Sequence, residues 1–103
     1  MSRLESLNEM IKQDPTDPFL HYALALEHEK SEDIHKAVGV LELLKKFHPD
    51  YLPTYYKLGK LYELLLNNIA AIAVYKMGIE VAKKQNERKT LAELNEAVMN
   101  LED

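Results

Sequence analysis

Apolar residues recur along the whole chain at intervals of three and four positions, the spacing that places side chains on one face of an α-helix. Near the N-terminus, for example, Leu4, Leu7, Met10 and Ile11 follow this spacing. No run of alternating polar and apolar residues is long enough to predict a β-strand. The pattern therefore predicts an all-α fold.

Prolines and capping residues divide this pattern into about six helices. Pro15 and Pro49 each end a helix, because proline disfavours the helical conformation in the residue before it. Pro53 is expected to open one. Residues whose side chains can accept a hydrogen bond from the first turn of a helix are expected to act as N-caps: Ser2, Asp17, Asp33, and Asn67 or Asn68. Since the connections are short, helices adjacent in sequence should be antiparallel neighbours in space.

The pattern also repeats itself after 34 residues. A shift by this distance places Leu24 on Leu58 and Ala25 on Gly59. Small residues at such positions allow two paired helices to approach closely, while large residues fill the space on either side. Gly59 and Gly78 are accordingly predicted to be helix-packing positions. Repetition at this period is typical of stacked helix pairs, each of which covers the apolar face of its neighbour.

The repeated residues resemble the tetratricopeptide repeat (TPR) family. Its pattern is aromatic–x2–Leu–Gly/Ala–x2–Tyr in one helix and Ala–x3–aromatic–x2–Ala in the next, followed by Pro. One repeat matches it in order at Tyr55, Leu58, Gly59, Tyr62, Ala71, Tyr75 and Gly78; the other matches at Leu24, Ala25, Ala37, Leu41 and Pro49, with His21 and His28 at its aromatic positions. The resemblance implies a right-handed α-α superhelix, a TPR-like solenoid of about six antiparallel helices.

On this basis residues 1–103 are predicted to form a single TPR-like domain. It would comprise an N-terminal half-repeat helix at 2–14, repeat one at 18–50, repeat two at 52–84 and a C-terminal capping helix at 87–102. Leu44 replaces a small residue of the family pattern, and two further departures concern the ends of helices. Lys83 stands where a further proline would fall, so the fifth helix is expected to run past it. Leu66 stands near a turn where the family favours glycine.

Composition narrows the possible functions. The absence of cysteine excludes disulfide scaffolds, thiolate nucleophiles and cysteine-ligated metal sites. A net charge of −4 argues against a nucleic-acid-binding protein, which normally needs a basic face to contact the phosphates. The longest apolar run, residues 69–75, is far shorter than a membrane-spanning helix, and the N-terminal segment has no signal-peptide pattern. We therefore expect a cytoplasmic protein without a nucleic-acid or membrane partner.

Neither catalysis nor metal binding is predicted. The three glycines are too widely spaced for a phosphate-binding loop, and the serines lack the context of a nucleophile. His21 and His28 lie roughly 10 Å apart along one helix axis, too far to share an ion. Both occupy aromatic packing positions of the repeat. We expect no enzyme activity, no cofactor and no metal site.

The resemblance does imply a peptide groove, because in this family the first helix of each repeat lines a concave surface. Carried over by repeat position, the groove residues are Phe19, Tyr22, Leu26 and Glu29 in repeat one and Pro53, Tyr56, Lys60 and Glu63 in repeat two. Tyr22 and Tyr56 could instead simply pack between helices. The chaperone-binding branch of the family uses Lys and Asn where Tyr22 and Leu26 stand. A more apolar ligand is therefore expected, with a basic residue near Glu29 or Glu63.

Two function classes remain open. The first is a protein–protein interaction module that binds an extended or helical peptide of an unidentified partner. The second is structural self-assembly, since the first and last helices lack their repeat partners and could pair between chains to form a homo-oligomer. An enzyme would need a pocket with convergent titratable groups, and the sequence contains no such pattern.

Overall fold

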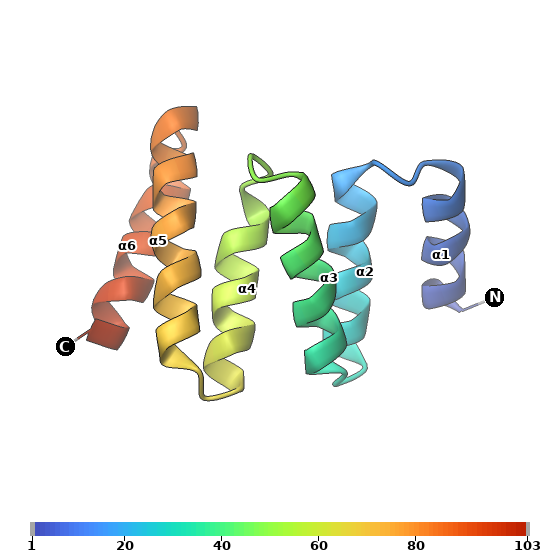
Figure 1. Ribbon diagram of the computed structural model, residues 1–103, viewed down its shortest axis with the longest axis horizontal. Helices are drawn as coiled ribbons and strands as arrows, with labels where there is room; N and C mark the ends of the chain where they lie inside the picture. Colours follow the sequence, from blue (N-terminus) through green and yellow to red (C-terminus); the bar gives the residue numbers. More distant parts are fainter. Residues whose placement is uncertain (1, 103) are drawn as a thin grey trace. The chain divides into compact units, whose positions relative to one another are not determined.

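The computed structural model describes residues 2–102, and this part of the chain consists of helices joined by turns, without strands (Figure 1). Its six helices are α1 (Arg3–Gln13), α2 (Pro18–Lys30), α3 (Ile34–Phe47), α4 (Pro53–Leu64), α5 (Asn68–Gln85) and α6 (Arg88–Glu102). The prediction of an all-α fold with about six helices is confirmed. The outermost limits of the predicted domain, residues 1 and 103, lie outside the described residues.

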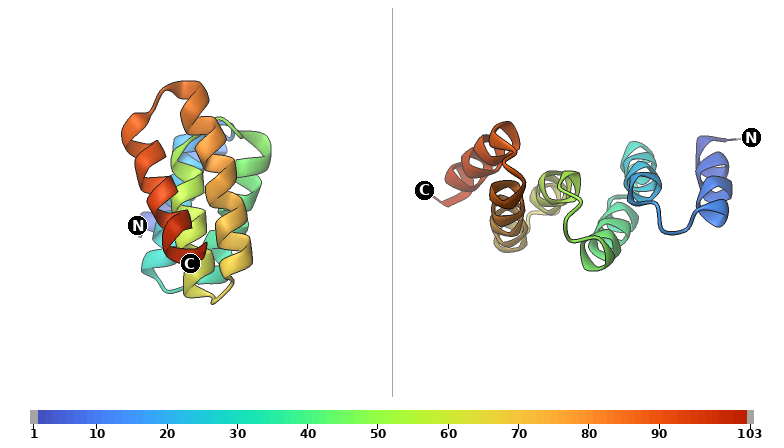
Figure 2. Two further views of the ribbon diagram at one scale, coloured as in Figure 1. Left: turned by 90° about the vertical axis from the view of Figure 1, so that its left-hand side faces the viewer. Right: turned by 90° about the horizontal axis from the view of Figure 1, so that it is seen from above.

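The chain divides into two compact units, Met1–Tyr51 (the N-terminal unit) and Leu52–Asp103 (the C-terminal unit). The first contains α1 to α3 and the second α4 to α6. Within each unit, successive helices run antiparallel and are joined by short turns (Figures 1 and 2). Each unit is therefore a small helical layer with its own apolar interior.

Three of the six helices in residues 2–102 begin with a capping hydrogen bond to the side chain of a predicted residue. The side chains of Ser2, Asp17 and Asn67 each accept a hydrogen bond of 2.9–3.1 Å from a backbone N–H in the first turn that follows. Asp33 stands at the predicted position before α3, but its side chain makes no capping hydrogen bond. Asp33 is therefore the N-cap residue of α3, as predicted, but the predicted hydrogen bond to its side chain is absent.

The end of α5 follows the expectation for a missing proline. The helix runs past Lys83 to Gln85 and stops at Asn86, whose backbone is left-handed with φ 56°. Asparagine tolerates this conformation better than most residues, which suits it to ending a helix. α5 packs along α6, the last helix of the chain.

Two glycines bring helices of the C-terminal unit close together. A Cβ atom at Gly59 would overlap the ring of Tyr75, and one at Gly78 would lie 2.5 Å from Cβ of Tyr55 and 3.1 Å from Leu94. Both tyrosines and Leu94 are fully buried. Gly59 and Gly78 are thus helix-packing positions, as predicted. The surrounding core comprises Leu52, Tyr55, Ala71, Tyr75, Ile79, Ala82, Leu94, Ala97 and Val98.

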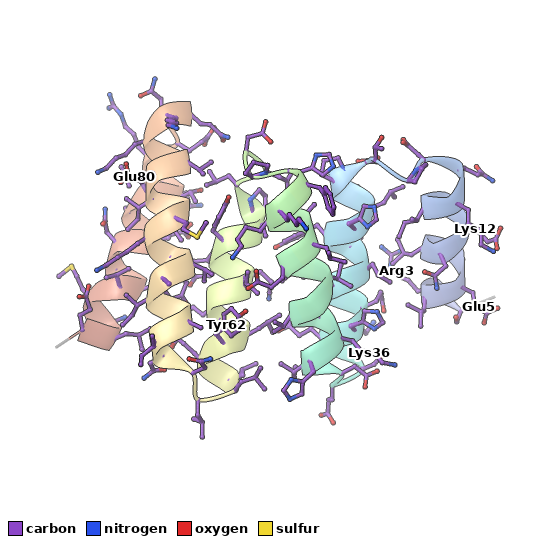
Figure 3. The ribbon with its side chains drawn as sticks, viewed as in Figure 1. Arg3, Glu5, Lys12, Lys36, Tyr62 and Glu80 are labelled. Carbon is purple, nitrogen blue, oxygen red and sulfur yellow. The ribbon has the colours of Figure 1, made fainter. Side chains whose placement is uncertain are left out.

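Smaller residues fill the interior of the N-terminal unit. Its buried apolar residues are Leu7, Ala23, Ala25, Ala37, Leu41 and Leu44. The Arg3 side chain extends from α1 towards α2 (Figure 3), where it forms an ion pair of 2.9 Å with Glu27. Alanines at the helix contacts keep α2 and α3 close, the role that glycines have in the other unit.

The turns after α2 and α4 contain residues in an unfavourable backbone conformation. Glu32 has φ 64° and Leu66 has φ 59°, and the two are separated by the repeat length of 34. A left-handed conformation costs a residue with a Cβ atom roughly 1–2 kcal/mol. Leu66 is also 91% exposed, so its side chain gives almost no packing in return.

Leu66→Gly is therefore expected to stabilise the protein by about 0.5–1 kcal/mol, since the relieved strain exceeds the extra chain entropy of glycine in the unfolded state. Urea unfolding followed by circular dichroism measures the change. Leu66→Ala is the matched control, because it shortens the side chain and keeps the strained Cβ. A glycine variant less stable than the alanine variant contradicts the assignment of strain.

Candidate functional site

Four of the predicted groove residues lie on one face of α2. The spacing of Phe19, Tyr22, Leu26 and Glu29 keeps them within a narrow stripe of the helix. Phe19 and Leu26 are exposed, whereas Tyr22 and Glu29 are half-buried. This stripe, the α2 face, is therefore mainly apolar and ends in one carboxylate.

Tyr22 is held in place by a second aromatic residue. Its ring centroid lies 5.9 Å from that of Tyr51, with the two planes tilted by 59°. Tilted contacts at this distance are favourable for aromatic rings. Burial, and secondarily the negative charge of Glu29, raises the pKa of Tyr22 above its ordinary value. At neutral pH the Tyr22 hydroxyl is therefore uncharged and can donate a hydrogen bond. The contact with Tyr51 restrains the orientation of its ring.

The other four predicted residues lie on one face of α4, here called the α4 face: Pro53, Tyr56, Lys60 and Glu63. Pro53 and Tyr56 are exposed. The ammonium nitrogen of Lys60 is 5.2 Å from the centroid of the Tyr56 ring, within the range of a cation–π interaction. It is also 3.7 Å from the Glu63 carboxylate. The two charges of this face thus compensate each other.

A buried tyrosine anchors Glu63 from the core side. The Tyr75 hydroxyl donates a hydrogen bond to the Glu63 carboxylate, and the Tyr75 ring lies 6.1 Å from that of Tyr56. Burial, followed by the hydrogen bond and the charge of Glu63, raises the pKa of Tyr75 far above its ordinary value. The repeat pattern marks Tyr75 only as a packing residue, so its hydrogen bond to Glu63 was not predicted. The sequence feature that could have predicted this hydrogen bond is the placement of a carboxylate and a tyrosine on two consecutive antiparallel helices.

An apolar pocket of about 620 Å³ lies elsewhere in the N-terminal unit, between the α1–α2 turn, α2 and α3. It is lined by Pro15, Thr16, His21, Leu24, Val40, Leu43, Leu44, Phe47 and His48. None of these residues was predicted to form a binding site. The available signal was a second apolar stripe on α3, in which Val40, Leu43, Leu44 and Phe47 follow helical spacing.

The histidines do not gather into a metal site. Nε2 of His21 donates a 2.7 Å hydrogen bond to the carbonyl of Pro15, and His28 is half-buried on the same helix. Within residues 2–102 no group of three or more His, Cys, Asp or Glu side chains is arranged to hold a metal ion. None of the helices in this range combines the length and the apolar character needed to cross a membrane.

Comparison with protein-family models gives no match, and comparison with curated proteins gives none either. Among solved structures, the chain is similar to a tetratricopeptide repeat domain protein from Salinibacter ruber. Its solution NMR structure matches with a TM-score of 0.83 and 47% sequence identity, over 86% of this chain and 90% of that one. The chain belongs to the tetratricopeptide repeat family.

Two further solved structures are similar to this chain. A crystal structure of the tetratricopeptide repeat domain protein of Salinibacter ruber matches with a TM-score of 0.79 and 46% identity, over 84% of this chain and 96% of that one. A Bordetella parapertussis protein, 21% identical, shares the fold with a TM-score of 0.82 over 98% of this chain and 88% of that one. The predicted family and fold class, an α-α superhelix of the TPR type, are therefore confirmed. TPR domains generally mediate protein–protein interactions, so the chain is a helical repeat module of that kind.

Proposed function

We propose that this TPR domain is a non-enzymatic, cytoplasmic module that binds a peptide segment of a partner protein. The peptide lies in a concave groove to which repeat one (18–50) contributes the α2 face and repeat two (52–84) the α4 face. The observation that carries the proposal is a pair of supported tyrosines at matching repeat positions. Tyr22 rests against Tyr51, and Tyr56 rests against Tyr75.

Supported tyrosines suit recognition for an entropic reason. A tyrosine offers a large contact area and a polar hydroxyl with only two side-chain torsions to restrict, which makes it frequent at binding surfaces. Here the neighbouring rings already restrain Tyr22 and Tyr56 before any ligand arrives. Less freedom is then lost on binding, which favours affinity.

The charges of the two faces suggest the chemistry of the peptide. Lys60 lies between Tyr56 and Glu63, so the α4 face carries an internally compensated pair. The α2 face has the carboxylate of Glu29 beside the apolar Phe19 and Leu26. A peptide with apolar residues and one basic residue near Glu29 or Glu63 complements these carboxylates. A strongly acidic peptide would be repelled from the α2 face.

Removing both tyrosines is expected to weaken partner binding strongly. Truncation of a central aromatic contact typically costs about 2 kcal/mol, which corresponds to a loss of ~30-fold in affinity for each residue. Partners captured from the native lysate by the wild type and by the Tyr22→Ala/Tyr56→Ala variant provide the first comparison. The captured segment, as a synthetic peptide, is then titrated into labelled protein and followed by NMR.

Met99→Ala is the control, since Met99 is exposed on α6 and belongs to neither face. It should bind as the wild type does, and all three proteins should show the same helical content. Chemical-shift changes confined to α3 and α5, or equal affinity of the double tyrosine variant, would contradict the groove assignment.

Structural self-assembly through the terminal helices is the second candidate. The observation that favours it is apolar surface at both ends of the chain: Leu4 and Met10 are exposed on α1, and Met99 is exposed on α6. If these helices pair between chains, Met10→Glu and Met99→Glu should each reduce the mass measured by light scattering at high concentration. A mass unaffected by either substitution excludes this route.

A further inference from the structure

Three large aliphatic side chains are exposed in and beside the turn between α4 and α5. Leu64 is 62% exposed, Leu66 91% and Ile69 86%, and together they are called the aliphatic knob. The matching positions of the other repeat are Lys30, Glu32 and His35, all polar. The repeat architecture therefore does not require apolar residues at this turn. Clusters of exposed aliphatic residues on a soluble domain commonly mark interaction sites.

Leu66 in particular gives the fold nothing in return for its conformation. Its backbone is left-handed, with φ 59°, and its side chain is almost entirely in solvent. Because no core contact explains a leucine at this position, the side chain is available to an external surface. The surface that receives it must accept a neutral group, since no residue from Leu64 to Tyr75 is charged.

The apolar pocket of the N-terminal unit has the properties of such a receptor. Its volume of about 620 Å³ falls in the range of ~300–1,000 Å³ found for small-ligand pockets, and its lining contains no Lys, Arg, Asp or Glu. Leu24, Val40, Leu43 and Leu44 form its apolar walls. The hydrogen bond from His21 to the Pro15 carbonyl fixes the α1–α2 turn that forms its edge.

We propose that the aliphatic knob of one copy of this chain inserts into the apolar pocket of a second copy. Knob and pocket are both mainly apolar, neither contains Lys, Arg, Asp or Glu, and both are present in every copy. The contact is heterologous, so each associated pair retains one free knob and one free pocket, and growth continues into an open chain or closes as a ring. This contact is independent of the peptide faces on α2 and α4 and of the terminal helices.

The contact is small, so the association is weak and exchanges rapidly. Stable interfaces bury roughly 1,200–2,000 Å² in total, far more than three side chains provide. In sedimentation equilibrium, the weight-average mass of the wild type should therefore equal the monomer mass of 11.9 kDa in dilute solution and rise with concentration. Methyl signals of Leu66 and Leu43 should shift together over the same concentration range.

Two variants separate the knob from the pocket. The knob variant is Leu66→Asn/Ile69→Gln, which removes apolar surface at exposed positions and places at 66 a residue that tolerates the left-handed backbone. The pocket variant is Leu43→Glu, a helix-forming residue at an exposed position of α3. Each variant alone should remain at the monomer mass at every concentration, with the helical content of the wild type.

An equimolar mixture of the two variants is the decisive sample. The knob variant retains its pocket and the pocket variant retains its knob, so the mixture should form dimers whose mass stops at twice that of the monomer. A wild type that stays monomeric at all concentrations overturns the proposal, as does association that persists in either variant alone or a mixture that fails to dimerise. Association abolished by Met10→Glu or Met99→Glu but retained by the knob variant also overturns it and assigns the contact to the terminal helices.

Discussion

Gly59→Ala is expected to destabilise the protein by about 1–3 kcal/mol, the usual cost of extra atoms in a well-packed core. The added Cβ would overlap the ring of Tyr75, which is fully buried and cannot withdraw without moving its neighbours. The hydrogen bond from the Tyr75 hydroxyl to Glu63 restrains that ring further. Thermal unfolding followed by circular dichroism should show a fall in Tm of roughly 4–8 °C for each kcal/mol.

Gly39→Ala is the matched control for this prediction. Gly39 also lies inside a helix, α3, but a Cβ built there meets nothing within 4 Å. Alanine favours a helix interior over glycine by about 0.5–1 kcal/mol, so Gly39→Ala should stabilise the protein. The same chemical change is thus expected to have opposite signs at the two positions. A stabilising Gly59→Ala would contradict the close contact between position 59 and the Tyr75 ring.

The contact between Gly59 and Tyr75 belongs to the part of the structure that the sequence predicts well. A small residue in one helix and a large one in the next recur at a fixed period, and packing geometry leaves few ways to satisfy that pattern. Helix boundaries follow for a similar reason, because proline and capping residues act on the chain locally. The four predicted residues of α2 and the four of α4 share a face because helical spacing alone decides it.

Other features depend on geometry that spacing does not encode. The pattern identified Leu66 as a departure from the glycine of the family, and the structure keeps the left-handed turn despite the leucine. Packing of α4 against α5 therefore outweighs the local preference of one residue. The hydrogen bond from Tyr75 to Glu63 and the pocket beside α3 also depend on how neighbouring helices pack against each other. The spacing of residues along the sequence does not specify that packing.

Tyr75→Phe is expected to destabilise the protein at neutral pH by about 1.5–3 kcal/mol, the usual contribution of a hydrogen bond to a charged group. The substitution keeps the ring that packs against Gly59 and removes only the hydroxyl that donates to Glu63. Lys60 remains 3.7 Å from the same carboxylate and compensates part of its charge, which favours the lower end of this range. Urea unfolding of the two proteins at pH 7 measures the difference.

The same pair of proteins should differ in their response to alkaline pH. The pKa of Tyr75 is raised in the folded protein, mainly by burial and then by its contact with Glu63, whereas the unfolded chain ionises near pH 10. The stabilising contribution of the neutral phenol is therefore complete below about pH 10 and is lost as the pH rises further. Once the unfolded phenol is ionised, the loss approaches ~1.4 kcal/mol per pH unit.

Comparing unfolding free energies at pH 7, 9, 10 and 11 isolates this effect, because other groups titrate equally in both proteins. Tyr22 and Tyr51 also have raised pKa values, so the stability of both proteins should fall somewhat above pH 10. The fall should be steeper in the wild type, and the difference in unfolding free energy between wild type and Tyr75→Phe should narrow only above that pH.

Tyr56→Phe is the control, because it removes a hydroxyl from an exposed ring of the α4 face. It should change the unfolding free energy by less than about 0.5 kcal/mol. A gap between wild type and Tyr75→Phe that stays constant from pH 7 to 11 would mean that the buried hydroxyl ionises as readily in the folded protein as in the unfolded chain.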